Sequence, residues 1–312
     1  MSGKIELNRN FTDFLKLLAA LLVAASHYSG YAVSHGHGNV VYSVLVATGG
    51  YIGVAIFFFL SGYGLMMSEK KRHTPFLSFI KRRLVKLYLP VVLVSAIWGI
   101  VQWPDDRGIE WMGHYLYLAL WGFGDGILWF VRVILVEYLL FAAYIYLNIK
   151  SWMFETLLWL GTALVYGFVF FYVGDWAAIS IPIFTLGILS AKYESWFYSI
   201  ARGKGVILWL IAITGIMGFA YNLMGNVYAH ALLNYYVITG VILAGVYSLT
   251  SKIPPPNLPS WAGPVSYDIY LTHYKVLYYC SAVYVFIGLH HFIVGLILLS
   301  SASCGLRKVL RI

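Results

Sequence analysis

The sequence has few charged residues for its length. Only 11% of its 312 residues are Asp, Glu, Lys or Arg, whereas an ordinary soluble domain contains about 25%. Hydrophobic residues make up 61% of the chain, against roughly 45–50% in soluble domains. So much apolar surface does not fit inside one soluble core, which excludes an ordinary globular protein in water. A lipid bilayer is the expected solvent for most of the chain.

Cysteine is nearly absent as well. Cys280 and Cys304 both lie in apolar stretches, so we interpret them as buried free thiols and expect neither a disulfide framework nor a metal site. The histidine pairs His35/His37 and His290/His291 have no carboxylate or cysteine at ligand spacing. They therefore do not indicate a metal site either. The sequence also lacks a nucleophile elbow, a phosphate-binding loop and a zinc signature. The first apolar run has no recognisable signal-peptide cleavage site.

Apolar stretches are abundant, and about ten of them approach the roughly 20 residues that a helix needs to span a bilayer. They lie near 14–33, 44–67, 85–103, 126–147, 153–173, 177–191, 205–223, 233–250, 265–286 and 291–306. The segment 111–125 is aromatic but broken by glycine, so we expect it to be interfacial or re-entrant. The sequence predicts an all-α, polytopic membrane bundle that forms one domain over residues 1–312, with no separate soluble domain.

Basic residues are distributed unevenly between the two sides of this topology. When the N-terminus is placed in the cytoplasm, the predicted outside loops contain only Arg107 among all Lys and Arg residues. This asymmetry follows the positive-inside rule and places both termini in the cytoplasm. It also accounts for most of the net charge of +9, so nucleic acid is not expected as a partner.

Ionisable side chains inside the predicted spans are costly in lipid, which makes each of them a candidate for function. Lys16 and His27 are eleven residues apart in the first span. They therefore lie about 20° apart on one helical face and roughly 16 Å apart along the axis. Asp13 is spaced to pair with Arg9 or Lys16. The alternative interpretation is that Lys16 snorkels to the interface and His27 bonds to a neighbouring helix.

The later spans also contain charged residues. Arg132 and Glu137 are five residues apart in the fourth span and project about 140° apart, so each needs a partner on another helix or in an aqueous cavity. Lys275 and Asp268 share one face of the ninth span, where they are candidates for a structural pair.

Two segments between the first and the fourth predicted spans have both a functional and a structural interpretation. Residues 53–64 (GVAIFFFLSGYG) contain Ser61 among glycines, which permit close helix packing. Residues 79–90 (FIKRRLVKLYLP) carry four cations. Arginine binds phosphate bidentately, whereas cytoplasmic anchoring is the alternative interpretation of the cations.

The ordered set of motifs resembles the acyltransferase 3 family of membrane O-acyltransferases over nearly the whole chain. Lys16 and His27 fit its opening pattern of a basic residue, ten intervening residues and a histidine. Residues 57–63 (FFFLSGY) resemble its Phe-Phe-x-x-Ser-Gly-Phe signature, and residues 82–90 (RRLVKLYLP) resemble its double-Arg segment before proline. Residues 266–273 (SYDIYLTH) resemble its late Ser-x-x-Ile-Tyr-Leu-x-His stretch.

The sequence departs from the family's pattern at three positions. Lys16 and Lys86 stand where arginine is commoner, and Tyr63 stands where phenylalanine is. The charge or the ring is kept in each case, but lysine loses the bidentate geometry of arginine.

The resemblance implies transfer of an acyl group, usually acetyl, from cytoplasmic acyl-CoA to a hydroxyl, commonly on a cell-envelope sugar. His27 is the expected catalytic residue, either as a general base or as a transient acyl carrier. The cations expected to bind acyl-CoA are Lys16, Arg82, Arg83 and Lys86. The candidates for supporting roles are Asp13, Ser61, Arg132, Glu137 and His273.

The resemblance also implies the partners and the location. Acyl-CoA is the donor substrate, and no permanently bound cofactor is expected. The other expected partners are a glycan or lipid-linked saccharide acceptor and membrane lipids, in the bacterial cytoplasmic membrane; an oligomer is an open alternative. The rival hypothesis is a transporter or flippase for an anionic or lipid-linked substrate, which would use Arg132, Glu137 and Lys275 equally well. A purely structural scaffold is disfavoured by the number of buried ionisable groups.

Overall fold

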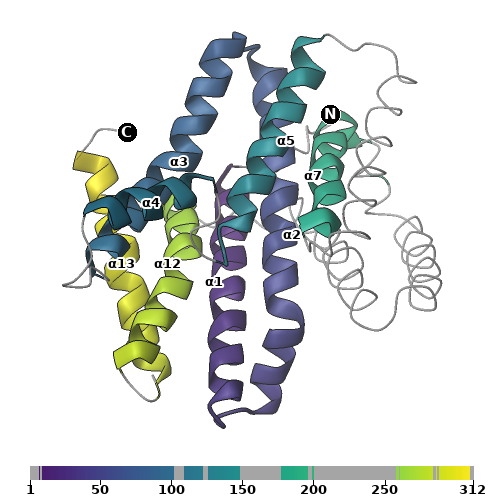
Figure 1. The fold of residues 1–312 in the computed structure, drawn as a ribbon. Helices are drawn as coiled ribbons and strands as arrows, with labels where there is room; N and C mark the ends of the chain where they lie inside the picture. The colour runs from purple at the N-terminus through teal and green to yellow at the C-terminus, as the bar shows by residue number, and fades with distance from the viewer. Residues whose placement is uncertain are drawn as a thin grey trace. The chain divides into compact units, whose positions relative to one another are not determined.

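The structure is a computed structural model of the 312-residue chain. It describes residues 7, 9–101, 109–121, 126–147, 177–195, 199, 258–259, 261–283, 286 and 288–309. Every regular element in these residues is an α-helix (Figure 1), which confirms the all-α class. The chain forms two compact units. Unit 1 contains Met1–Ser26, Val44–His73 and Gly161–Gly263, and unit 2 contains His27–Ser43, Thr74–Leu160 and Pro264–Ile312.

Four of the described helices are long and apolar enough to cross a membrane. They are α1 (Arg9–Ser34), α2 (Val40–Lys71), α3 over its segment Phe76–Ile100, and α5 (Trp129–Tyr146). Each lies at a predicted span. The spans predicted near 153–173, 205–223 and 233–250 lie outside the described residues.

Three further helices occupy predicted spans without meeting the same combination of length and hydropathy. They are α7 (Ala177–Lys192), α12 (Ala262–Val283) and α13 (Leu289–Val309). With 22 residues, α12 is about 33 Å long, enough to span. Its sequence combines Asp268, His273 and Lys275 with several hydroxyl residues, which explains its low mean hydropathy.

The segment between the spans predicted near 44–67 and 85–103 is mostly helical, which corrects the helix boundaries expected from hydropathy. Helix α2 continues to Lys71, and α3 (Phe76–Val101) already begins at Phe76. The Pro75 carbonyl accepts the first helical hydrogen bond, from the Phe79 amide at 2.9 Å. Lys, Arg and Leu are good helix formers, so the basic segment extends the third helix instead of forming a loop before it.

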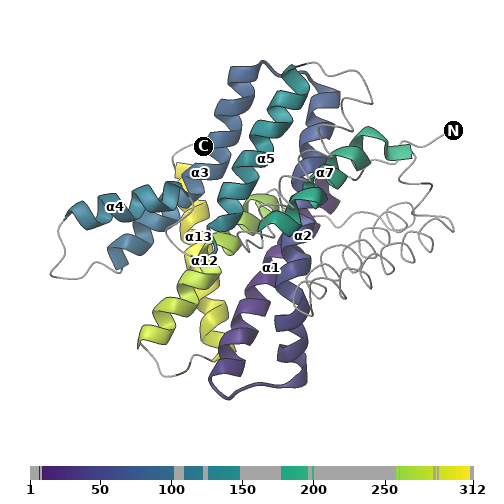
Figure 2. The same cartoon turned by 45° about the vertical axis from the view of Figure 1, so that its right-hand side comes forward.

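The aromatic segment predicted to be interfacial or re-entrant contains a short helix, α4 (Ile109–Leu120). Its 12 residues span about 18 Å, too short to cross a bilayer. It lies against the C-terminal part of α3 (Figure 2), where a Cβ on Gly99 would come within 2.5 Å of the Met112 sulfur.

In unit 1, the helices approach one another through glycine. A Cβ on Gly53 of α2 would clash with the Ala19 carbonyl oxygen of α1. A Cβ on Gly62 of α2 would clash with the Phe184 carbonyl oxygen of α7, and one on Gly187 of α7 would clash with the Phe59 carbonyl oxygen of α2. Small residues allow helix backbones in a membrane to pack this closely, so Gly53 and Gly62 of segment 53–64 have a packing role.

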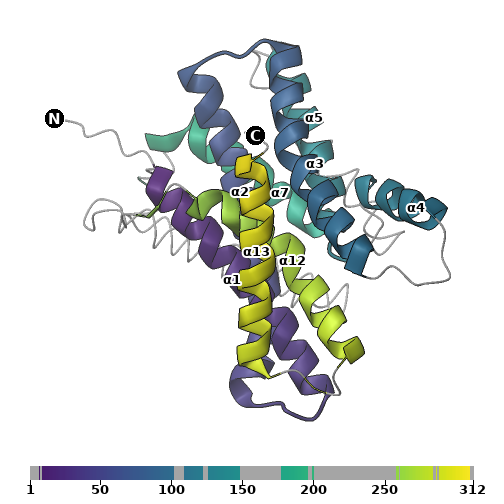
Figure 3. The same ribbon diagram turned by 90° about the vertical axis from the view of Figure 1, so that its left-hand side faces the viewer.

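In unit 2, α12 is joined to several helices by polar contacts. Asp268 Oδ1 accepts a hydrogen bond from Ser303 of α13 at 2.9 Å, and the Thr272 hydroxyl lies 3.2 Å from that of Ser300. The Tyr267 hydroxyl donates to the Leu87 carbonyl of α3 at 3.1 Å. Figure 3 shows α13 and α12 side by side. The late motif 266–273 therefore fixes the position of α12 within its unit.

Candidate active site

The predicted catalytic histidine lies in α1, within unit 2. One side of His27 is exposed, and its ring contacts two consecutive residues of α12. The ring centroid lies 5.0 Å from that of His273, at an interplanar angle of 39°, and 5.7 Å from that of Tyr274, edge to face. The structure thus brings together His27 and His273, which belong to different motifs of the sequence.

The second imidazole is completely buried. His273 Nδ1 contacts the Ile269 carbonyl at 3.3 Å, and its ring also packs against Tyr270 at 5.7 Å. Its Nε2 has no hydrogen-bond partner among the residues that the structure describes. The buried His273 ring therefore packs against one side of the His27 ring. The other side of His27 stays accessible to a reactant. An accessible imidazole held in this way is suited to accept a proton from a hydroxyl.

The basic residues of α3 divide between two faces. Arg82 is exposed and donates to the Thr74 hydroxyl at 2.9 Å and to the Ser78 carbonyl at 3.2 Å. Lys86 is also exposed, four residues further along the same face. Arg83 is half-buried, with its guanidinium 5.5 Å from the centre of the Phe79 ring. Arg82 and Lys86 are thus brought together, whereas Arg83 lies on the face that packs inward.

The remaining predicted cation lies in unit 1. Asp13 pairs with both neighbours proposed from spacing, with Lys16 at 3.3 Å and with Arg9 at 3.6 Å. Because Lys16 belongs to the other compact unit, its grouping with the cations of α3 stays a prediction. Ser61 of α2 is half-buried in unit 1, and its supporting role also stays a prediction.

The charged residues of α5 have different environments. Glu137 is completely buried, and neither of its carboxylate oxygens has a hydrogen-bond partner in the described segments. Arg132 is half-buried. No described contact joins either residue to His27, so nothing in the geometry assigns them to this site.

Lys275 and Asp268 have separate partners on other helices. The Lys275 ammonium donates to the Tyr115 hydroxyl of α4 at 2.9 Å, whereas Asp268 accepts from Ser303. Sequence reasoning missed Tyr115, because nothing in the primary sequence relates α4 to α12.

Tyr63, the tyrosine that replaces the family's phenylalanine, has a structural role. Its hydroxyl accepts a hydrogen bond from the Leu7 amide at 3.0 Å and donates to Glu194 Oε1 at 2.8 Å. A phenylalanine would leave both partners without these bonds. The tyrosine at position 63 therefore forms hydrogen bonds within unit 1 that a phenylalanine cannot form.

Metal-ligating side chains are scattered in the described part of the chain. No three His, Cys, Asp or Glu residues gather there in an arrangement that could hold a metal ion. Cys304 is a half-buried free thiol, while the side chain of Cys280 lies outside the described residues.

A comparison with known protein families gives a match that covers the helices described above. A family model described as "Acyltransferase domain", that of the acyltransferase 3 family, matches residues 9–306. The chain belongs to the acyltransferase 3 family. The match runs from the start of α1 into α13, and with four candidate spans it identifies a membrane acyltransferase. No curated protein and no solved structure matches the chain significantly.

Proposed function

We propose that this acyltransferase transfers an acetyl group from cytoplasmic acetyl-CoA to a hydroxyl of a cell-envelope saccharide. The supporting observation is the His27 ring, which is exposed on one side and held on the other by His273 and Tyr274. Family membership supplies the reaction class. The expected setting is the bacterial cytoplasmic membrane, with about ten spans and both termini in the cytoplasm.

In the proposed reaction, His27 acts as the general base. It takes the proton of the acceptor hydroxyl while the hydroxyl oxygen attacks the thioester carbonyl carbon. A carbon–oxygen bond forms, the carbon–sulfur bond breaks, and CoA leaves as a thiolate that takes up the proton from the His27 imidazolium. A positioned base contributes about 10²–10⁴-fold to such a rate. The alternative, an acyl-imidazole on His27, would release one equivalent of CoA before acceptor is added.

The donor is proposed to enter from the cytoplasmic end of the helices. Its phosphates would be bound by Lys16, Arg82, Arg83 and Lys86. Helix α1 is continuous from Arg9 to Ser34, so Lys16 and His27 are separated by roughly 16 Å along its axis. An extended pantetheine arm, on the order of 15–20 Å long, spans this rise. The thioester would then lie near the imidazole while the phosphates stay close to the cytoplasm.

The proposal is tested with the purified full-length protein in lipid. A thiol reagent measures CoA release from acetyl-CoA, and mass spectrometry measures acetylation of added oligosaccharides. An acetyltransferase gives CoA release that rises with acceptor and yields a product with one additional acetyl group. A transporter or flippase gives neither, so acceptor-independent, background-level CoA release would contradict the proposal.

Removing the charge of Lys86 is expected to weaken donor binding. Hydrogen bonds to charged groups contribute about 1.5–3 kcal/mol, so Lys86→Gln should raise the KM for acetyl-CoA about 10-fold and change kcat little. The matched control is Lys81→Gln, which removes an exposed lysine from a different face of α3. Equal KM values for the two variants would exclude Lys86 from the donor site.

A further inference from the structure

An aromatic surface on α12 extends from the His27 ring. Tyr274 and Tyr278 are 38% and 55% exposed, and four residues apart they lie on one face, about 6 Å apart along the helix. Tyr274 contacts the His27 ring, and Tyr278 contacts the ring of Trp98 on α3 at 6.2 Å. Trp98 itself is buried, at 7% exposed. The two tyrosines therefore form the exposed surface, which begins at the proposed catalytic imidazole and is backed by the Trp98 ring.

A buried cation lies beside this surface. Lys275 is only 3% exposed, and its ammonium lies 5.8 Å from the centre of the Trp98 ring and 5.6 Å from that of Tyr115. Aromatic faces attract such a cation, and the Tyr115 hydroxyl accepts its hydrogen bond. The positive charge is thus held by two rings, one of which, that of Trp98, also contacts Tyr278.

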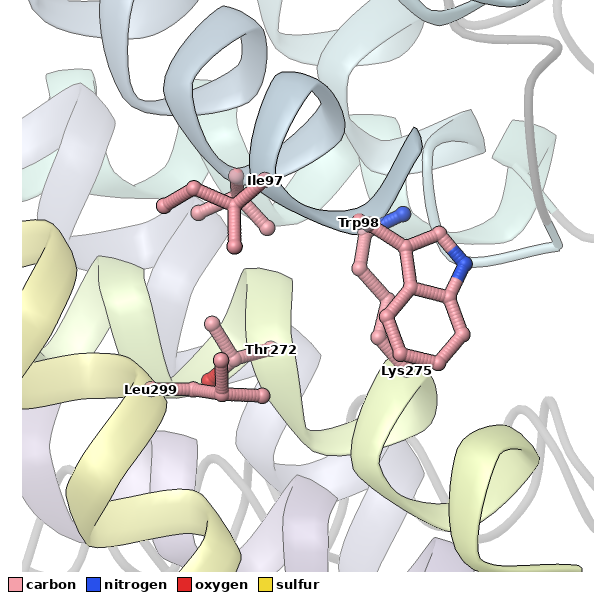
Figure 4. Close-up of a pocket in the computed structure, with 6 residues that line it drawn as sticks. Ile97, Trp98, Thr272, Lys275 and Leu299 are labelled. Atoms are coloured by element: carbon pink, nitrogen blue, oxygen red, sulfur yellow. The ribbon is translucent and has the colours of Figure 1, made fainter. Parts of the chain in front are cut away.

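A small cavity adjoins the same residues. Its volume is about 10 Å³, and Figure 4 shows Ile97 and Trp98 of α3 on one side, with Thr272 and Lys275 of α12 and Leu299 of α13 on the other. This space is close to the minimum that holds one water molecule. The lining is mostly apolar, and Thr272 and Lys275 contribute a hydroxyl and an ammonium group to it.

The chemistry of this surface differs from that of a neighbouring face of the same unit. The exposed side chains of α13 include Ile293, Val294, Ile297 and Leu298, all aliphatic, as contact with lipid tails favours. Tyrosine and tryptophan offer an apolar ring together with a hydrogen-bonding group. A sugar ring presents the complementary combination, because its C–H faces stack on aromatic rings while its hydroxyls form hydrogen bonds.

We propose that Tyr274 and Tyr278, with Trp98 and Lys275 buried behind them, form the acceptor subsite and bind the sugar rings of a saccharide. This rests on the proposed function, because the subsite is assigned to the acceptor through its contact with His27. Stacking on Tyr278 orients the sugar chain along α12, so that the reacting hydroxyl reaches the exposed side of His27.

The test replaces Tyr278 by leucine in the full-length protein in lipid. Leucine keeps an apolar surface toward lipid but removes the ring on which a sugar would stack. The acceptor probes are maltotetraose, chitotetraose and tetragalacturonate, with acetyl-CoA as donor. For the probe that the wild type acetylates best, Tyr278→Leu should raise the acceptor KM about 10-fold. The KM for acetyl-CoA and the thermal stability should stay unchanged.

The matched control is Tyr117→Leu, which removes a ring that is 58% exposed on α4 and contacts Trp121. Equal acceptor KM values for the two variants would overturn the subsite and leave the α12 rings as interfacial anchors. A wild type that acetylates none of the probes would contradict the saccharide acceptor itself, and the subsite with it. If Tyr278→Leu is unstable, Tyr274→Leu provides the second measurement and is expected to raise the acceptor KM by a similar factor.

Discussion

Replacing His27 with alanine is expected to lower acetyl transfer about 100- to 10,000-fold, the usual contribution of a positioned general base. The fall should be in kcat, because the proposed donor contacts lie elsewhere on the chain. The protein should fold normally, since one side of His27 is exposed and its contacts to His273 and Tyr274 are ring contacts at 5.0 and 5.7 Å. Acceptor-dependent CoA release measures kcat, and a thermal melt in the same lipid measures the stability of the fold.

A second histidine, directly after the last residue of α1, provides the control for this prediction. His35 lies near the end of α1, is exposed, and has its Nδ1 atom 2.8 Å from the Tyr31 carbonyl. His35→Ala removes the same chemical group from a position without a neighbouring imidazole of α12, so transfer should stay within about twofold of the wild type. If His27→Ala keeps full transfer, the proposed mechanism is wrong. Release of one equivalent of CoA by the wild type without acceptor would favour the acyl carrier over the base.

Replacing Gly62 with alanine is expected to destabilise the fold by about 3 kcal/mol. The added methyl group would overlap the Phe184 carbonyl oxygen of α7 and approach the Ile188 nitrogen at 3.2 Å. These are backbone atoms, which cannot turn aside as the end of a flexible side chain does. The helices also cannot shift independently, because Gly187 makes the reciprocal close approach to Phe59 and Tyr63 of α2. Thermal denaturation in lipid or detergent measures the loss.

The control for Gly62 lies two residues further along α2. A Cβ on Gly64 would meet nothing within 4 Å, and alanine is a better helix former than glycine by about 1 kcal/mol. Gly64→Ala should therefore melt at the wild-type temperature or slightly above. Indistinguishable melting of the two variants would show that close packing at Gly62 does not hold α2 and α7 together.

Helices and their local pairs could be predicted because both depend on short-range spacing. The apolar runs predicted α1, α2 and α5 closely, and the separation of three or four residues predicted that Asp13 pairs with Lys16 and Arg9. The start of α3 was predicted wrongly. Hydropathy marks where a helix enters lipid, whereas the helix itself extends as far as backbone hydrogen bonds and good helix formers allow.

Gly62 illustrates a prediction that identified close helix packing but not the partner helix. Its sequence context indicated close packing, yet it did not identify Phe184 of α7 as the opposing residue. Likewise, the tyrosine at 63 was visible as a departure from the family's pattern, while its hydrogen bond to Glu194 depends on how distant segments meet.

The sequence by itself determined the class of this protein: an all-α membrane protein whose ordered motifs resemble the acyltransferase 3 family. Composition and periodicity are sufficient for that, because the bilayer requires long apolar helices and the helix repeat relates residues a few turns apart. Only the tertiary structure decided that His27 meets His273 and Tyr274, and that Tyr278 continues this surface to Trp98. Contacts between separate helices depend on the register and rotation with which their side chains pack, and no spacing along the chain contains that information.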